Sequence, residues 1–122
     1  VQFKDCKLVG LHFEDCSDFN FEVRFENCNL DLSSFYKRVL KKMVFKNVTL
    51  READFTDADL SAAVLDDCDL TGAIFDNTNL EKADLRTAHH FNINPANNKV
   101  KRAKFSLTGL PGLLHQFQID IS

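Results

Sequence analysis

The chain lacks the short motifs on which many enzyme active sites are built. Its 122 residues contain neither GxSxG nor HExxH, and glycine, needed for phosphate-binding loops, occurs only four times. The four cysteines form no CxxC pair and have no companion histidines at the spacing of a zinc site. The sequence therefore predicts a non-enzymatic protein without a cofactor or a metal.

Long apolar runs and a strong net charge are also missing. No stretch approaches the roughly 20 apolar residues of a membrane span, and the first residues do not form a signal-peptide pattern. The formal net charge is only −3, so the whole molecule has no general attraction to nucleic acid or to an anionic membrane. Because unpaired cysteines suit a reducing compartment, we expect a cytoplasmic protein without direct nucleic-acid or membrane contacts.

What the sequence does contain is Phe or Leu at every fifth position. A period of five fits neither the 3.6 residues of a helix nor the 2.0 of a strand, so the backbone must turn a corner once per repeat. Four such corners close a square coil. The uninterrupted series is Phe25, Leu30, Phe35, Leu40, Phe45, Leu50, Phe55, Leu60, Leu65, Leu70, Phe75, Leu80 and Leu85.

A second series of small residues lies two positions before these central residues. Small side chains can fill the space beside the large ones inside a narrow coil. The series contains Cys28, Ala53, Ala58, Ala63, Cys68, Ala73, Thr78, Ala83 and Ala88.

The repeated units resemble a known motif. Residues 53–57 (ADFTD), 58–62 (ADLSA) and 83–87 (ADLRT) are similar to the A(D/N)LXX repeat of pentapeptide-repeat proteins. The resemblance implies an all-β fold, a right-handed quadrilateral β-helix with about 20 residues per coil, stacked at the strand spacing of ~4.8 Å. We expect about five to six coils with a short C-terminal helix/strand cap.

Central residues twenty apart should then stack in four columns. The first repeats, centred on Phe3, Leu8 and Phe13, lie two residues out of register, which a two-residue bulge between Asp15 and Arg24 explains. The predicted columns are Phe25, Phe45, Leu65, Leu85 and Phe105; Leu30, Leu50, Leu70, His90 and Leu110; Phe35, Phe55 and Phe75; and Leu40, Leu60, Leu80 and Val100.

Several residues test this arrangement. The register correction stacks Cys6 on Cys28, at a separation compatible in principle with a disulfide, although we expect both thiols to point inward and stay reduced. Arg38 falls at a small inward position, and because burying a guanidinium is costly, the backbone there should bulge outward. His90, next to His89, takes a central position. A metal or proton site is one interpretation, and simple failure of the repeat is the one we favour.

The repeat weakens toward the C-terminus. Residues 91–98 have turn chemistry, and residues 103–107 restore one repeat. Residues 110–117 are apolar at helical spacing, and Ile119 with Ile121 alternates like a short strand.

These features predict one β-helix domain over residues 1–109, irregular at 16–24 and 91–100, and a cap over residues 110–122. Residues 113–121 resemble the C-terminal segment of the Qnr-type quinolone-resistance branch, in which a double-Leu helix and alternating Ile or Val residues form a dimer contact. The alternative is a plain cap, which any solenoid end needs. The residues of this cap or dimer contact are Leu110, Leu113, Leu114, Phe117, Ile119 and Ile121.

Charge is unevenly distributed along the repeats. Between residues 52 and 84, Lys82 is the only base. The acidic residues of this segment, the acidic band, are Glu52, Asp54, Asp57, Asp59, Asp66, Asp67, Asp69, Asp76, Glu81 and Asp84. The flanking basic residues are Lys37, Arg38, Lys41, Lys42, Lys46 and Arg51 before the band, and Arg86, Lys99, Lys101, Arg102 and Lys104 after it.

Two functional hypotheses follow. Carboxylates at strand spacing on a rod can imitate duplex phosphates, as the resemblance to the Qnr-type branch implies for a DNA mimic that binds a type II topoisomerase, DNA gyrase, and protects it from quinolones. Against this, Asp before the central residue often serves the turn. The alternative is a structural or scaffolding repeat domain of a longer protein, with an unrelated protein partner.

Overall fold

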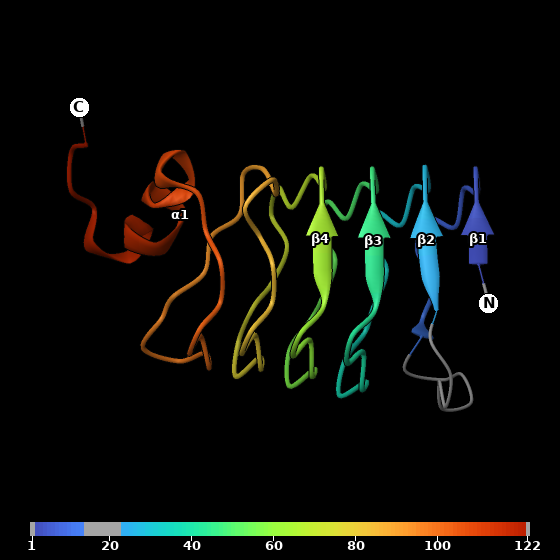
Figure 1. Cartoon of the computed structure of the whole chain (residues 1–122), viewed down its shortest axis with the longest axis horizontal. Coiled ribbons are helices and arrows are strands. Elements are labelled where there is room, and N and C mark those ends of the chain that lie inside the picture. Colours follow the sequence, from blue (N-terminus) through green and yellow to red (C-terminus); the bar gives the residue numbers. More distant parts are fainter. Residues whose placement is uncertain (1, 14–22, 122) are drawn as a thin grey trace.

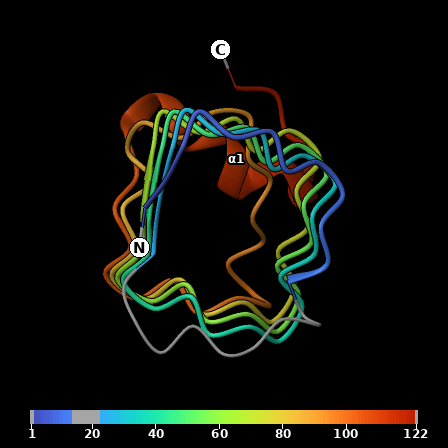
Figure 2. The ribbon, with the colours of Figure 1, turned by 90° about the vertical axis from the view of Figure 1, so that its right-hand side faces the viewer.

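A computed structural model describes residues 2–13 and 23–121 of the chain. The backbone winds as a square coil whose turns stack along one axis, with β1 near one end and α1 near the other (Figures 1 and 2). One side of the coil carries four short strands that pair in parallel in chain order. They are β1 (Gln2–Lys4), β2 (Arg24–Glu26), β3 (Val44–Lys46) and β4 (Val64–Asp66).

The pairing register confirms the repeat length. Phe3 lies beside Phe25, Phe25 beside Phe45, and Phe45 beside Leu65, so the first step spans 22 residues and the next two span 20. The other sides follow the same rule through isolated parallel bridges. The predicted two-residue shift is therefore confirmed, whereas most of the predicted bulge between Asp15 and Arg24 lies outside the described residues.

The corners explain why the period is five. Residues with positive φ recur at five-residue intervals, for example Lys42, Asn47, Glu52 and Asp57. At most corners the carbonyl oxygen of a central residue accepts a hydrogen bond from the N–H three positions later, as between Leu50 and Ala53 at 3.2 Å. One left-handed residue per repeat thus turns the chain by one side of the square.

The core consists of the predicted columns. The rings of Phe13, Phe35, Phe55 and Phe75 stack in order, with centroid separations of 4.6, 5.1 and 5.2 Å. Offset stacking of this kind adds to the burial of apolar area. We name the sides by their central residues: first side, Phe25, Phe45, Leu65 and Leu85; second side, Leu30, Leu50 and Leu70; third side, Phe35, Phe55 and Phe75; fourth side, Leu40, Leu60 and Leu80.

The small inward series also makes hydrogen bonds. At five of these positions in the described residues, a side-chain donor reaches the carbonyl oxygen of a central residue in the preceding coil, at 2.8–3.4 Å. A buried carbonyl needs such a partner. The donor–acceptor pairs are Cys28–Phe3, Ser33–Leu8, Cys68–Phe45, Thr78–Phe55 and Asn98–Phe75.

The backbone at Arg38 does not bulge outward, so that prediction is wrong. The Arg38 N–H donates to the Phe35 carbonyl oxygen at 3.0 Å, and the Arg38 carbonyl accepts from the Asp59 N–H at 2.9 Å, the same pattern as at Ala58 one coil later. The residue is only half-buried. A long side chain can cover apolar surface with its aliphatic part while the backbone keeps its regular hydrogen bonds.

The second column does not continue to His90 and Leu110, which corrects another prediction. His90 has φ 60° and its side chain is 74% exposed, whereas Phe91 and Ile93 turn inward and are buried. Burying an imidazole costs more than burying a phenyl ring, so the apolar neighbours replace it in the core. Leu110 belongs to the C-terminal segment and is 40% exposed.

Short helices cover the C-terminal end of the coil, as expected. They are η2 (Leu107–Gly109), α1 (Pro111–Leu114) and η3 (His115–Phe117). Gly112 permits close contact, because a Cβ at this position would lie 2.5 Å from the carbonyl oxygen of Phe91. The Gly112 carbonyl accepts a hydrogen bond from the N–H of Ile93 at 2.9 Å.

The strand predicted around Ile119 and Ile121 does not form. This segment follows Gln118, which has φ 50°, and it pairs with none of the strands in the described part of the chain. Alternating apolar residues make a strand only where a neighbouring edge supplies hydrogen bonds. In residues 2–13 and 23–121, no helix has the length and apolar character that crossing a membrane requires.

Candidate interaction surfaces

The acidic band encircles the rod. A segment of 33 residues exceeds one coil of 20, so its acids must lie on all four sides. The predicted band therefore forms a belt around the axis, and a partner approaching from one direction meets only part of it. By side, the acids are Asp66, Asp67 and Asp84 on the first; Glu52 and Asp69 on the second; Asp54, Asp57 and Asp76 on the third; and Asp59 and Glu81 on the fourth.

Four acids of the band serve the local backbone. A side-chain oxygen of each accepts a hydrogen bond from the N–H two residues later, at 2.9–3.1 Å; the four are Asp54, Asp59, Asp69 and Asp84. Asp stabilises turns in this way. The expectation that several acids of the band are structural is confirmed for these residues.

Two of these turn aspartates also hold an arginine. Asp84 pairs with Arg86 at 2.8 Å, and hydrogen bonds from Arg86 lower the pKa of Asp84. Burial alone would raise the pKa of Asp69, but hydrogen bonds from Thr71 and Arg51 outweigh it and hold the pKa well below its usual value. Both carboxylates thus stay charged well into the acidic range.

Two histidines meet the band at its C-terminal edge. His89 Nε2 lies 2.9 Å from Asp67 Oδ1, and His90 Nδ1 lies 3.6 Å from Asp69 Oδ1. The ring centroids of His89 and His90 are 6.3 Å apart. Within the described ranges, no group of three or more His, Cys, Asp or Glu side chains is arranged to hold a metal ion.

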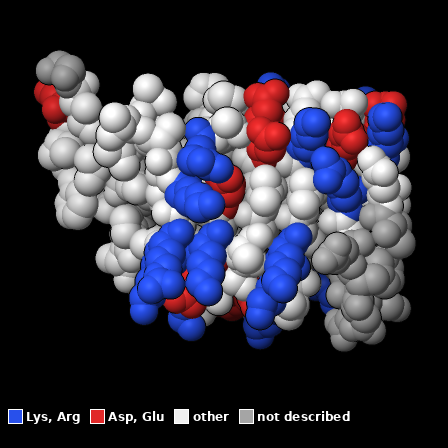
Figure 3. Space-filling model, in the orientation of Figure 1, with Lys and Arg blue, Asp and Glu red and all other residues white. Residues whose placement is uncertain are grey.

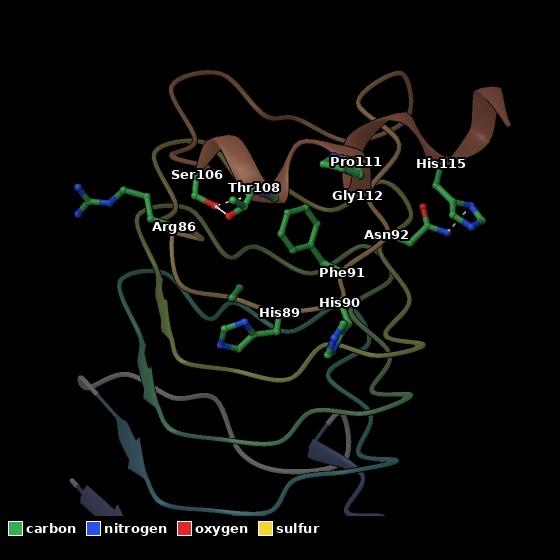
Figure 4. Close-up of a pocket in the computed structure, with 12 residues that line it drawn as sticks. Arg86, His89, His90, Phe91, Asn92, Ser106, Thr108, Pro111, Gly112 and His115 are labelled. Carbon is green, nitrogen blue, oxygen red and sulfur yellow. Dashed lines mark hydrogen bonds between the residues drawn. The ribbon is translucent and has the colours of Figure 1, made fainter. Parts of the chain in front are cut away.

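These histidines border an open pocket of about 530 Å³ between the last coil and the cap (Figure 4). Phe91 separates His89 and His90 from the hydroxyls of Ser106 and Thr108, which lie 3.1 Å apart. The Ser106 hydroxyl also accepts the Gly109 N–H at 3.1 Å. This hydroxyl is therefore engaged in capping η2, and the pocket presents no nucleophile hydrogen-bonded to a histidine.

The basic flanks meet across the acidic band on the fourth side. Lys41 and Lys42 line a groove of about 650 Å³ together with Lys82, Lys101 and Arg102. Along the chain these residues are separated by up to 61 positions, and Lys82 looks like an isolated base. A comparison of positions twenty apart, 42 with 62, 82 and 102, would have found the site.

The C-terminal end presents an apolar groove of about 590 Å³. The groove is lined by Pro95, Ala96, Leu110, Leu113, Leu114, Gln116 and Phe117. Phe117, within this groove, and Ile119 and Ile121, which follow it in the chain, are exposed by 63%, 54% and 53%. The structure thus brings four of the six predicted contact residues, Leu110, Leu113, Leu114 and Phe117, to one groove.

The family follows from this architecture and from the sequence. The model of the pentapeptide repeat region matches residues 1–75 and 19–94. This chain belongs to the pentapeptide-repeat family, whose structures are right-handed quadrilateral β-helices. The fold is generally a non-enzymatic structural or interaction fold.

Solved structures agree with the fold. The pentapeptide repeat protein Rfr23 from the cyanobacterium Cyanothece 51142 is 20% identical, with a TM-score of 0.63 over 87% of this chain and 88% of that chain. HetL from Nostoc sp. strain PCC 7120, involved in heterocyst differentiation regulation, is 24% identical, with a TM-score of 0.55 over 87% of this chain and 38% of that chain.

A more distant likeness extends to the predicted branch. QnrB1, a plasmid-mediated fluoroquinolone resistance protein, is 13% identical, with a TM-score of 0.39 over 100% of this chain and 92% of that chain. That likeness is too weak to carry a functional argument. Among curated proteins, none matches the chain significantly.

Proposed function

We propose that this protein is a non-enzymatic interaction module that pairs with a second copy through its C-terminal end and presents its acidic band to a protein partner. The apolar groove at the C-terminal end carries this proposal. An exposed aromatic ring in an apolar groove, followed in the chain by two exposed isoleucines, is the kind of apolar surface that marks interaction sites.

The second copy is the occupant that this end suits best. A two-fold contact requires one patch to be complementary to itself, with both a depression and a projection. The groove between Leu110 and Leu114 supplies the depression, and Ile119 and Ile121 supply the projection. Pairing would remove these side chains from water in both copies at once.

Sedimentation of the wild type and of Phe117→Glu at 1–100 µM tests the pairing. We expect the wild type to dimerise and the variant to remain monomeric with an unchanged melting temperature. Val39→Glu is the matched control, because Val39 is an exposed aliphatic residue three coils before Lys99, the last-coil residue at the same position. A wild type that stays monomeric throughout this range contradicts the proposal.

The acidic band offers two forms of the partner interaction. In the gyrase form, a DNA mimic occupies the duplex site of a type II topoisomerase, and two copies joined end to end would set two acidic belts along one axis. In the scaffold form, the belt contacts a partner unrelated to DNA. The circumferential belt and its four turn aspartates favour the scaffold form, because fewer carboxylates face any one direction.

A supercoiling assay with DNA gyrase and a quinolone separates the two forms. The informative variant replaces Asp57, Asp66 and Asp67 by Asn, because these band residues make no turn hydrogen bond of the Asp54 type. Under the gyrase form this variant loses protection, whereas neutralising Asp5 and Glu26, outside the band, leaves it intact. If the wild type neither protects nor inhibits gyrase up to tens of micromolar, the gyrase form is excluded and the scaffold form remains.

A further inference from the structure

One corner of the coil differs from the others in the residues that adopt the left-handed conformation. After the first side, these residues are Asp5, Asn27, Asn47 and Asp67, the types that tolerate positive φ best after glycine. After the fourth side they are Lys42, Ala62, Lys82 and Arg102, with φ of 63°, 58°, 62° and 61°. Three of these four left-handed positions thus hold basic side chains, and strained backbone positions often mark a functional surface.

This corner borders the groove on the fourth side, which we call the basic valley. Ser61 and Ala62 form part of its floor, because their side chains are short. Lys41 and Lys42 rise from the coil before them, and Lys82 rises from the coil after them. Lys42 and Lys82 are two coils apart, so their backbones are separated by roughly 10 Å. Figure 3 shows the basic side chains as blue columns along the lower edge, with an uncharged interval between them.

The valley carries an excess of positive charge. Five cations line it, against the two carboxylates of Asp59 and Glu81. Asp59 already accepts the N–H of Ser61 at 2.9 Å. Within residues 2–13 and 23–121, the salt bridges of the protein involve none of the five cations, which are exposed. Their charge is therefore available to a partner.

We propose that the basic valley binds an acidic segment of a partner protein in extended conformation. The two neighbours of one extended chain at the ordinary strand spacing of ~4.8 Å are likewise roughly 10 Å apart. Acidic side chains of the segment would reach Lys42 and Lys82 on either wall. Glu81, next to Lys82 on one wall, would accept a backbone N–H of the segment.

The chemistry of the lining favours a polypeptide over nucleic acid. A phosphodiester backbone has no hydrogen-bond donor to offer Glu81, whereas a polypeptide backbone carries one at every residue except proline. The valley also contains no aromatic side chain on which bases could stack. This site lies apart from the C-terminal groove, and although Asp59 and Glu81 also belong to the acidic band, its binding depends on the five cations, so it is distinct from the function proposed above.

Fluorescence anisotropy with a labelled ten-residue Glu-Ser repeat peptide tests the site. We expect binding that weakens with salt, as exposed charges require. Replacing Lys82 and Arg102 by Glu should reduce the affinity at least tenfold. The matched control replaces Lys7 and Lys46 by Glu, exposed lysines outside the valley, with the same change in net charge and an expected loss below twofold.

A second variant separates the valley from general electrostatics. Ser61→Phe fills the floor without changing charge and should also weaken binding at least fivefold. Circular dichroism and melting curves verify that each variant folds. The proposal is overturned if the peptide does not bind at 1 mM, if both charge variants lose affinity equally, or if Ser61→Phe binds like the wild type.

Two further outcomes assign the valley to another occupant and equally overturn the proposal. One is tighter binding of a ten-nucleotide thymidine strand than of the acidic peptide under the same conditions. The other is self-association of the wild type that salt and the Lys82→Glu/Arg102→Glu variant abolish, which would place the acidic band of a second copy in the valley.

Discussion

The hydroxyl group of Thr78 donates a hydrogen bond to the carbonyl oxygen of Phe55, 2.8 Å away in the preceding coil. Both residues lie in the interior, where an unmade hydrogen bond is costly. The bond joins the two chemical series of the repeat, the large central residues and the small residues that precede them. It therefore offers a direct measure of how strongly successive coils are held together.

Thr78→Val should lower the free energy of unfolding by about 1 kcal/mol, the usual net value of one hydrogen bond. Valine has nearly the shape of threonine and is more apolar. Without the hydrogen bond, the substitution would therefore raise stability. Urea denaturation gives the sign of the change, and an increase in stability contradicts the assigned contact.

Phe55→Ala should cost about 3 to 5 kcal/mol, because the ring lies between Phe35 and Phe75 in a filled column. Tyr36→Ala is the control on the same side of the coil, where the ring is exposed, and a change within about 0.5 kcal/mol is expected. Wild-type-like denaturation of Phe55→Ala would mean that this column is wrongly assigned.

Replacing each of two adjacent alanines by glycine should change the stability of the fold in opposite directions. Ala62 has φ 58°, so Ala62→Gly relieves a left-handed conformation and should stabilise the fold by about 0.5 to 1 kcal/mol. Ala63 is fully buried outside the left-handed region, so Ala63→Gly should destabilise it by about 1 kcal/mol. Thermal melting of the two variants measures both effects, and changes of equal sign would refute the corner geometry.

Asp69 should contribute to stability only above acidic pH. Its pKa in the folded state is below the unfolded value, so its contribution is complete above about pH 5, where the unfolded carboxyl is ionised, and is lost as the pH falls through the folded pKa. Asp69→Asn should therefore lower the melting temperature at pH 7, with a difference that shrinks toward pH 2. Asp120→Asn, in the C-terminal segment, should show no such trend.

Thiol labelling without reductant tests the cysteines. Burial raises the pKa of Cys28, and it raises the pKa of Cys68 to about 12, so both thiols should react slowly in the native protein. Cys6 is half-buried and should react faster. All three are free in the structure, and peptide mapping distinguishes them from Cys16, which lies outside the described residues. Failure of both Cys6 and Cys28 to react after unfolding would reveal a disulfide.

Much of the fold could be predicted because the five-residue period leaves the central residues little freedom. The stacking of Phe35 on Phe55 follows from counting twenty residues. The prediction failed at His90, which the period places in the core. Periodicity assigns an inward position without regard to the cost of burying the residue found there. Ile119 and Ile121 show the complementary error, because alternation alone says nothing about whether a partner strand is present.

The interaction surfaces were less predictable for a geometric reason. Reading along the chain groups Asp57 with Asp59 and Asp66, although these acids lie on three different sides. It also separates Lys42 from Lys82, although both rise from one corner. Surface neighbours on this rod lie twenty residues apart, so local charge runs describe bands around it.

The constant offset of twenty residues makes the outside of this protein a two-dimensional grid, with coils as rows and stacked positions as columns. Each outward cell can change its chemistry without disturbing the interior, because the core occupies separate positions of the repeat. The binding surface can therefore be changed by substituting one outward position at a time. Exchanging a whole coil of twenty residues replaces one repeat on each of the four sides and leaves the stacking register of the other coils unchanged.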